Sequence, residues 1–266
     1  MDWMVYLKAL LLGMLEGLTE FLPISSTGHL IIAEDLLGFT GERAKSFAIF
    51  IQLGAILAVC WYYRPKIWNI GRRFPQDPAA RGFILNLAVA FMPAAILGLM
   101  LRHAIKQYLF HPLTVACALI AGGFIILLIE RLARQPHIQT VDDIRWQDAL
   151  KVGCAQAFAL IPGTSRSGAT IMGGLMFGLS RPAATEFSFF LAIPTMFAAT
   201  GYDLIKSWQI LQPSDLGLFG IGFLAAFVSA FVAVKALLSY ITNHDFLVFA
   251  YYRLLFGLIV FVYFWV

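Results

Sequence analysis

The sequence predicts an all-α polytopic membrane protein, and three observations support this fold class. Of its 266 residues, 60% are hydrophobic and only 13% are charged, whereas a soluble domain has about 25% charged residues. Six apolar stretches are long enough to span a bilayer. Two further apolar regions are broken by proline. We therefore expect a single integral membrane domain over residues 1–266.

The expected spanning helices follow from the thickness of the bilayer. About 20 helical residues cross a hydrocarbon core of about 30 Å. The segments that meet this length are 46–63, 83–101, 113–129, 187–205, 216–234 and 246–266. The basic residues fall mostly in the short loops between them, as membrane topology requires. The net charge of +4 therefore does not indicate a nucleic-acid partner.

The two broken regions predict a different element. Residues 3–37 are interrupted at Pro23, and residues 149–179 are interrupted at Pro162. The piece after each proline is too short to cross a bilayer. Irregular backbone at membrane depth is tolerated only where protein covers it or where it lines a cavity. We expect two re-entrant helix–loop–helix hairpins.

The hairpins also indicate an internal repeat. The sequence PISSTG (23–28) aligns with PGTSRSG (162–168), and both are followed by related segments, FAIFI (47–51) and FSFFL (187–191). The repeat units are expected at about 1–110 and 147–266. Three spanning segments separate the hairpins, so the hairpins enter from opposite faces. Such an inverted-topology repeat places its site near the midplane.

Basic residues are divided unequally between the two expected faces. The side of the first hairpin carries Lys8, Arg43, Lys45, Arg102, Lys106 and Lys206. The other side carries Arg64, Lys66, Arg72, Arg73, Arg81, Arg131, Arg134, Arg145, Lys151, Arg181 and Lys235. Because cytoplasmic loops carry the excess of Lys and Arg, we expect the second group in the cytoplasm. The first hairpin and both termini are then expected outside a bacterial inner membrane.

The first break carries groups that are expensive to bury in hydrocarbon. Glu16 and Glu20 are four positions apart and share a helical face, where like charges repel. A shared proton or a bound cation would relieve this repulsion. The alternative is a protonated carboxyl that packs against a neighbouring helix. Ser26 and His29 also share a side of a helix, and a serine beside a histidine is a nucleophile–base arrangement.

The second break has a different charge. Ala155 and Ala159 stand at the positions of the two acids, and Arg166 stands at the position of Thr27. The guanidinium of Arg166 offers a planar fork that suits a phosphate group. The alternative is a structural ion pair with an acid of the first hairpin. Arg253 is a further intramembrane cation, for which Glu186, Asp203 or a substrate could be the partner.

An acid pair, a Ser–His pair and an arginine loop that meet at mid-membrane suit phosphoryl transfer from a lipid-borne phosphate. The acids would hold a divalent cation, the arginine would neutralise phosphate oxygens, and a hydroxyl or water would attack in line. The main alternative is a lipid-phosphate transporter or flippase, because broken helices in an inverted repeat are also a transporter plan.

Two long motifs carry a family resemblance. EGLTEFLPISSTGH (16–29) and PGTSRSGAT (162–170), together with FSFFL and the pair Tyr252-Arg253, resemble the undecaprenyl-diphosphate phosphatase family, also called the bacitracin-resistance protein family. The resemblance implies a bacterial plasma-membrane enzyme that hydrolyses undecaprenyl diphosphate to the monophosphate and inorganic phosphate. This hydrolysis recycles the lipid carrier for peptidoglycan and other cell-wall synthesis, and it confers bacitracin resistance. The implied active site opens to the periplasmic face.

The resemblance also implies roles for single residues. Glu16 and Glu20 form the acidic motif of an enzyme that needs a divalent cation, Mg²⁺ or Ca²⁺. Ser26 is the favoured nucleophile, His29 is catalytic, and Arg166 binds the diphosphate. Phosphate contacts are expected from Ser25, Thr27, Thr164, Ser165 and Ser167. The expected partners are the polyprenyl substrate and membrane lipids, a homodimer stays open, and so does the choice between a covalent phosphoserine and a serine that orients water.

Overall fold

The structure is a computed structural model that describes residues 3–132, 135–207 and 215–265. Every regular element within these ranges is helical, apart from an isolated bridge between Ile138 and Leu179. The terminal residues 1–2 and 266, on which part of the expected orientation depends, lie outside the described residues, and so does Arg134. The side chains of Arg43, Lys106 and Lys206 are likewise not among those described.

Six helices in the described ranges are long and apolar enough to cross a membrane, which confirms an all-helical, multi-pass membrane protein. They are α3 (Glu42–Tyr62), α5 (Pro78–Ala104), α6 (Pro112–Leu132), α9 (Arg181–Ser207), α10 (Leu216–Ile241) and α11 (Leu247–Trp265). Each expected segment lies mostly within one of these helices, but α5 and α9 start earlier than expected, at Pro78 and Arg181, and α10 ends later, at Ile241. Proline suits a first helical position, and the Asp77 carboxylate caps α5 by accepting from the Ala79 N–H at 2.9 Å.

The two proline-broken regions form two pairs of shorter helices. The first pair is α1 (Trp3–Glu20) and α2 (Ser26–Leu36), and the second is α7 (Trp146–Ala157), extended by η3 (Phe158–Leu160), and α8 (Arg166–Met176). Both α2 and α8 have 11 residues. An α-helix of that length measures about 16 Å, roughly half of a hydrocarbon core.

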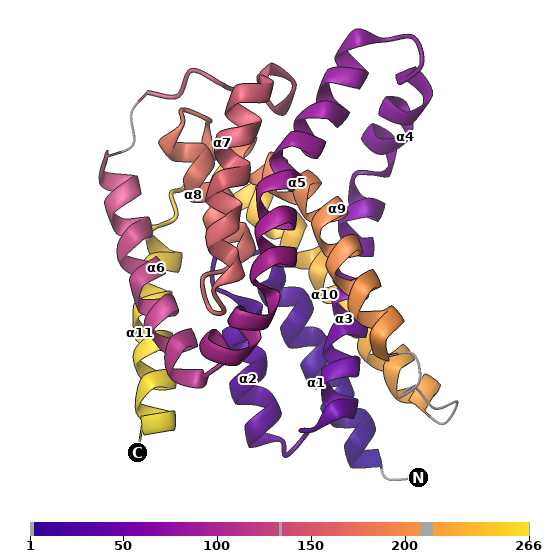
Figure 1. Cartoon of the computed structure of the whole chain (residues 1–266), viewed down its shortest axis with the longest axis vertical. Coiled ribbons are helices and arrows are strands. Elements are labelled where there is room, and N and C mark those ends of the chain that lie inside the picture. Colours follow the sequence, from indigo (N-terminus) through magenta and orange to yellow (C-terminus); the bar gives the residue numbers. More distant parts are fainter. Residues whose placement is uncertain (1–2, 133–134, 208–214, 266) are drawn as a thin grey trace.

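The two pairs run in opposite senses through the molecule. In Figure 1, α1 begins at the lower edge and α2 returns to it, whereas α7 begins near the upper edge and α8 returns toward that edge. A serine with positive φ stands at the N-cap position of each returning helix, Ser25 at 70° and Ser165 at 73°. The Ser165 hydroxyl accepts from the Gly168 N–H, whereas Ser25 makes no side-chain cap hydrogen bond. Non-glycine residues rarely adopt a positive φ, and this conformation concentrates at functional sites.

The helix starts correct one expected equivalence. Ser26 is the first residue of α2 and Arg166 is the first residue of α8, each directly after the serine at the N-cap position. The position that corresponds to Arg166 is therefore Ser26 and not Thr27. The reason is that the second turn contains one more residue between its proline and its helix than the first turn does.

Helix packing crosses between the two halves of the chain. Helix α1 packs on α10, α7 packs on α5, and α3 and α9 pack against each other, with the buried rings of Phe187, Phe189 and Phe190 in the core. Glycines allow the closest approaches, as is common between membrane helices. A Cβ at Gly13 would lie 2.2 Å from the carbonyl oxygen of Gly222 in α10, and one at Gly153 would lie 2.4 Å from that of Ala90 in α5.

Three short elements had not been expected. They are the basic helix α4 (Arg64–Arg73), the π-helical turn η1 (Ile105–Leu109) and the 3-10 turn η2 (Val141–Asp143). Helix α4 is too short and too charged for a span. It lies at the end of the molecule opposite to the chain termini in Figure 1.

Candidate active site

A cavity of about 250 Å³ lies between the two turns that join the paired helices. Its lining comes from both turns and from α3 and α9: Glu20, Ser25, Ser26, Thr27, Gln52, Ala159, Pro162, Gly163, Ser165, Arg166, Thr195, Met196 and Ala199. Residues far apart in the sequence thus share one polar cavity inside an otherwise apolar protein.

Glu20 is the carboxylate at which the two turns meet. The Ser26 hydroxyl donates to its Oε2 atom, and the Arg166 Nη2 atom lies 3.0 Å from its Oε1 atom. Both members of the ion pair are nearly buried, with side-chain exposures of 12% for Arg166 and 10% for Glu20. A buried carboxylate paired in this way is strongly held in one geometry. The ion pair that the sequence left as an alternative is therefore present, and it forms part of the cavity wall.

The guanidinium of Arg166 has one nitrogen, Nε, without a hydrogen-bond partner among the described residues. Its Nη1 atom donates to the Ser188 carbonyl at 3.2 Å, and its planar group lies 5.5 Å from the centre of the Phe21 ring. The unpartnered Nε–H is buried, and a buried unpaired donor is costly.

Glu16 is an unpaired buried acid. Its side chain is fully buried, and neither carboxylate oxygen has a partner within the described part of the chain. It does not line the cavity but lies one helical turn behind Glu20 on α1. Two orphaned oxygens fit a cation or a proton. The described residues contain no group of three His, Cys, Asp or Glu side chains that could hold a metal by themselves.

His29 lies in α2, and its side chain contacts α11. Its Nδ1 atom lies 2.8 Å from the Ser25 carbonyl oxygen, and its Nε2 atom lies 2.6 Å from the Tyr252 hydroxyl. Since a carbonyl only accepts, Nδ1 carries the hydrogen, and in the neutral ring Nε2 accepts from Tyr252. The ring also stacks on Phe256, with centroids 4.1 Å apart. The hydrogen bonds of Ser26 and His29 thus lead to different partners, and His29 supports the turn at Ser25.

The five hydroxyl groups expected to contact phosphate divide into two sets. Ser25, Thr27 and Ser165 line the cavity, whereas Thr164 and Ser167 do not. The Ser167 hydroxyl donates instead to the Leu22 carbonyl at 2.8 Å and so ties the second turn to the first.

Two cavity residues were missed by the sequence reasoning. Gln52 lies in α3 and Thr195 in α9, and both line the cavity. The Thr195 hydroxyl donates to the Leu191 carbonyl within α9 at 2.8 Å and also lies 3.3 Å from Gln156 Oε1. The available signal was a polar residue inside an apolar spanning segment, which commonly marks a functional position. Gln52 meets that criterion directly.

The partners suggested for Arg253 are occupied elsewhere. Glu186 pairs with Lys66 at 3.2 Å, and Asp203 pairs with Arg102 at 2.7 Å. The guanidinium of Arg253 donates to backbone carbonyls of both turns, as described below. It therefore does not pair with either acid.

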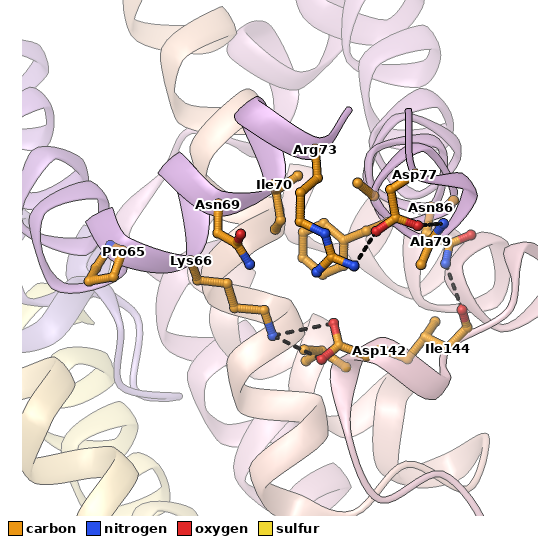
Figure 2. A pocket seen from close by; sticks show the side chains of 14 residues that line it. Pro65, Lys66, Asn69, Ile70, Arg73, Asp77, Ala79, Asn86, Asp142 and Ile144 are labelled. Atoms are coloured by element: carbon orange, nitrogen blue, oxygen red, sulfur yellow. Dashed lines mark hydrogen bonds and ion pairs between the residues drawn. The ribbon is translucent and has the colours of Figure 1, made fainter. Parts of the chain in front are cut away.

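A larger cavity of about 730 Å³ lies where α4, the start of α5 and η2 come together. Figure 2 shows that its charged side chains are directed at one another: Lys66 lies 3.4 Å from Asp142, and Arg73 pairs with Asp77. Asn86 donates to the Ile144 carbonyl at 2.6 Å. Its charged side chains are thus engaged in ion pairs, and the buried Asp77 Oδ2 atom has the pair with Arg73 but no hydrogen bond among the described residues.

Comparison with known proteins agrees with the motifs. Residues 9–259 match the family described as bacitracin resistance protein BacA. The chain is 61% identical over 260 residues to an undecaprenyl-diphosphatase of Nitrosomonas europaea, which covers 98% of this chain and 95% of that protein. Proteins of the same name from Nitrosospira multiformis and Pseudomonas fluorescens are 60% and 57% identical, again over 98% of this chain and 96% and 94% of their own lengths.

Proposed function

This chain belongs to the bacitracin resistance protein BacA family, and we propose that it hydrolyses undecaprenyl diphosphate to undecaprenyl phosphate and inorganic phosphate. The observation that carries the proposal is the bridge at Glu20, which accepts from Ser26 of one turn and from Arg166 of the other. A hydroxyl, a proton acceptor and a phosphate-binding guanidinium then lie together in one cavity.

The chemistry assigns one step to each of these groups. Ser26 Oγ attacks the terminal phosphorus, its proton passes to Glu20, and the bond from this phosphorus to the bridging oxygen breaks. Undecaprenyl phosphate leaves, and the phosphoryl group stays on Ser26. Water then attacks the phosphoserine while Glu20 returns the proton to Ser26 Oγ, and dihydrogen phosphate is released. Arg166 neutralises charge on the equatorial oxygens throughout, since phosphoryl transfer depends on such stabilisation.

A divalent cation, Mg²⁺ or Ca²⁺, is part of the proposal. The orphaned oxygens of Glu16 support it, and Glu16 with Glu20 would hold the ion. Mg²⁺ is commonly bound by one or two carboxylates together with substrate phosphates and water, which suits a chain that offers no larger acidic group in its described part. The ion would supply further neutralisation of the diphosphate.

The arrangement in the membrane is also proposed. Helix pairs α1–α2 and α7–α8 are re-entrant hairpins of an inverted-topology repeat, which the equal lengths of α2 and α8 and the serine with positive φ before each of them support. The basic helix α4 and its loop then face the cytoplasm. The first hairpin and the termini face the periplasm of a bacterial inner membrane, and the site opens there.

A direct assay tests the function. Purified protein in detergent with Mg²⁺ is expected to release phosphate from undecaprenyl diphosphate, and Ser26→Ala is expected to stop it. A folded protein that releases no phosphate with either cation, yet moves the lipid between leaflets of vesicles, would instead be the transporter alternative. Transport leaves the contact between Ser26 and Glu20 without a role.

A further inference from the structure

Arg253 of α11 uses all of its hydrogen-bonding capacity on main-chain oxygens. Its side chain is buried, with 1% exposure, and a guanidinium has five N–H donors. Its hydrogen bonds run to the carbonyl oxygens of Leu119 (3.2 Å), Pro23 (3.2 Å), Thr164 (2.8 Å), Ala118 (3.0 Å) and Gly163 (3.1 Å). Each of the five donors therefore has one acceptor.

These acceptors belong to three separate segments. Pro23 lies in the first turn, Gly163 and Thr164 lie in the second turn, and Ala118 and Leu119 lie in α6. No carboxylate in the described part of the chain pairs with Arg253. A buried charge without a counterion is retained only where hydrogen bonds compensate it. Here those bonds join the two turns that build the cavity.

The protein leaves room for this guanidinium at a glycine. A Cβ at Gly122 of α6 would lie 2.0 Å from Arg253 Nη2 and 2.5 Å from its Cζ. Contacts that short do not occur, so any side chain at this position displaces the guanidinium. A Cβ at Gly168, near the start of α8, would lie 3.2 Å from Arg253 Nη1.

Holding a carbonyl also orients the neighbouring amide. In a planar trans peptide unit, the C=O and the following N–H point in opposite directions. The bond from Arg253 to the Thr164 carbonyl therefore directs the Ser165 N–H away from Arg253. Ser165 lines the cavity and carries the strained φ of 73°. Arg253 thus holds the carbonyl group directly before this strained residue.

We propose that Arg253 is a positioning residue for the phosphatase reaction: it fixes the two turns against each other so that Ser26, Glu20 and Arg166 meet in one cavity. The inference rests on the proposed function. Arg253 itself does not line the cavity, so it acts through the geometry of the turns and not by contact with the substrate.

Two variants test the positioning role, Arg253→Lys and Gly122→Ala. Lysine keeps the charge but has three donors in place of the fork, and Gly122→Ala keeps the arginine but displaces it. Both are expected to lower kcat by about 100-fold, the effect of a misplacement of about 1 Å. KM should stay within about threefold, since direct phosphate contacts remain. Thermal unfolding supplies the folded fraction by which kcat is corrected.

Two matched controls show whether the loss of kcat depends on where the substitution is made or only on its type. Arg181→Lys makes the same exchange at an arginine that pairs with Glu130 away from the cavity, and Gly220→Ala adds a methyl group where nothing lies within 4 Å. Both should keep the wild-type kcat. A normal corrected kcat in Gly122→Ala, or a rise in KM alone, would overturn the positioning role. A wild-type protein that releases no phosphate would overturn the proposed function instead.

Discussion

The Nη2 atom of Arg166 lies 3.0 Å from the Oε1 atom of Glu20, although 146 positions separate the two residues. The contact joins the start of α8 to the end of α1, and with the bond from Ser26 it makes one carboxylate the meeting point of both turns. The site therefore exists only when both helix pairs are folded and packed.

Replacing Arg166 by lysine should lower kcat by about 100-fold, comparable to the loss of one donor that stabilises transition-state charge. Lysine can keep an ion pair with Glu20, but it lacks the planar fork by which Arg166 contacts Glu20 and Ser188 together. Phosphate release and thermal unfolding should be measured on the same preparation. Activity near that of the wild type would show that the fork is not needed.

The two acids should respond differently to neutral substitution. Glu16→Gln should raise the concentration of Mg²⁺ needed for half-maximal activity, because it removes a charged ligand of the proposed cation. It breaks no hydrogen bond within the described protein, since neither oxygen of Glu16 has a partner there. Glu20→Gln should lower kcat at every Mg²⁺ concentration, because it removes the proton acceptor of Ser26. Titration of Mg²⁺ into chelator-treated protein measures both. An unchanged Mg²⁺ requirement in Glu16→Gln would contradict the cation role of Glu16.

Ser26 should carry the phosphoryl group during turnover. Rapid acid quenching with substrate labelled at the terminal phosphorus should give a labelled protein, and Ser26→Ala should abolish the label. Ser229→Ala serves as the control, because the Ser229 hydroxyl donates only within α10, at 2.7 Å to the Ala225 carbonyl. Full turnover without labelled protein would instead show that Ser26 orients water.

Tyr252→Phe should lower kcat less than His29→Ala does. The phenylalanine variant loses one hydrogen bond to His29, worth about 1 kcal/mol, so less than a tenfold loss of kcat is expected. His29→Ala also releases the Ser25 carbonyl and the stacking on Phe256. Equal losses in the two variants would mean that the Tyr252 hydroxyl takes part in proton transfer.

The larger cavity should be dispensable for hydrolysis. Arg73→Ala breaks the pair with Asp77 at the end of α4, in which the arginine is exposed and the carboxylate is partly buried. Ion pairs at the surface contribute about 0–1 kcal/mol. We expect wild-type kcat and KM, and only a small change in thermal stability. A loss of activity comparable to that of Arg166→Lys would show that the two cavities are coupled.

The spanning helices were predictable because their signal is local. A run of apolar residues of bilayer length identifies α3, α5, α6, α9, α10 and α11 without knowledge of their neighbours. The proline breaks were equally visible, and so were the polar residues beside them. This criterion did not identify the short helix α4, because its charged residues are typical of a loop between spanning helices.

The contacts within the site were not predictable in the same way. Ser26 and His29 are close in sequence, yet Ser26 bonds to Glu20 and His29 bonds to Tyr252, 223 positions away. Helical spacing could place both side chains on one side but could not show what α11 brings to them. The hydrogen-bond partners of Arg253 were harder still to predict. Every residue has a carbonyl acceptor, so the sequence does not indicate which ones the guanidinium binds.

The acceptors of Arg253 have a consequence for genetics. The five oxygens that it binds belong to the main chain, so a change of side chain does not remove an acceptor. Gly163 is the exception in tolerance, because its φ is 93° and a Cβ there would lie 2.6 Å from the Val115 carbonyl oxygen. Because the acceptors belong to the main chain, no exchange at those positions can compensate for a missing guanidinium. A selection for restored growth that starts from Arg253→Lys should therefore return the original codon rather than second-site suppressors.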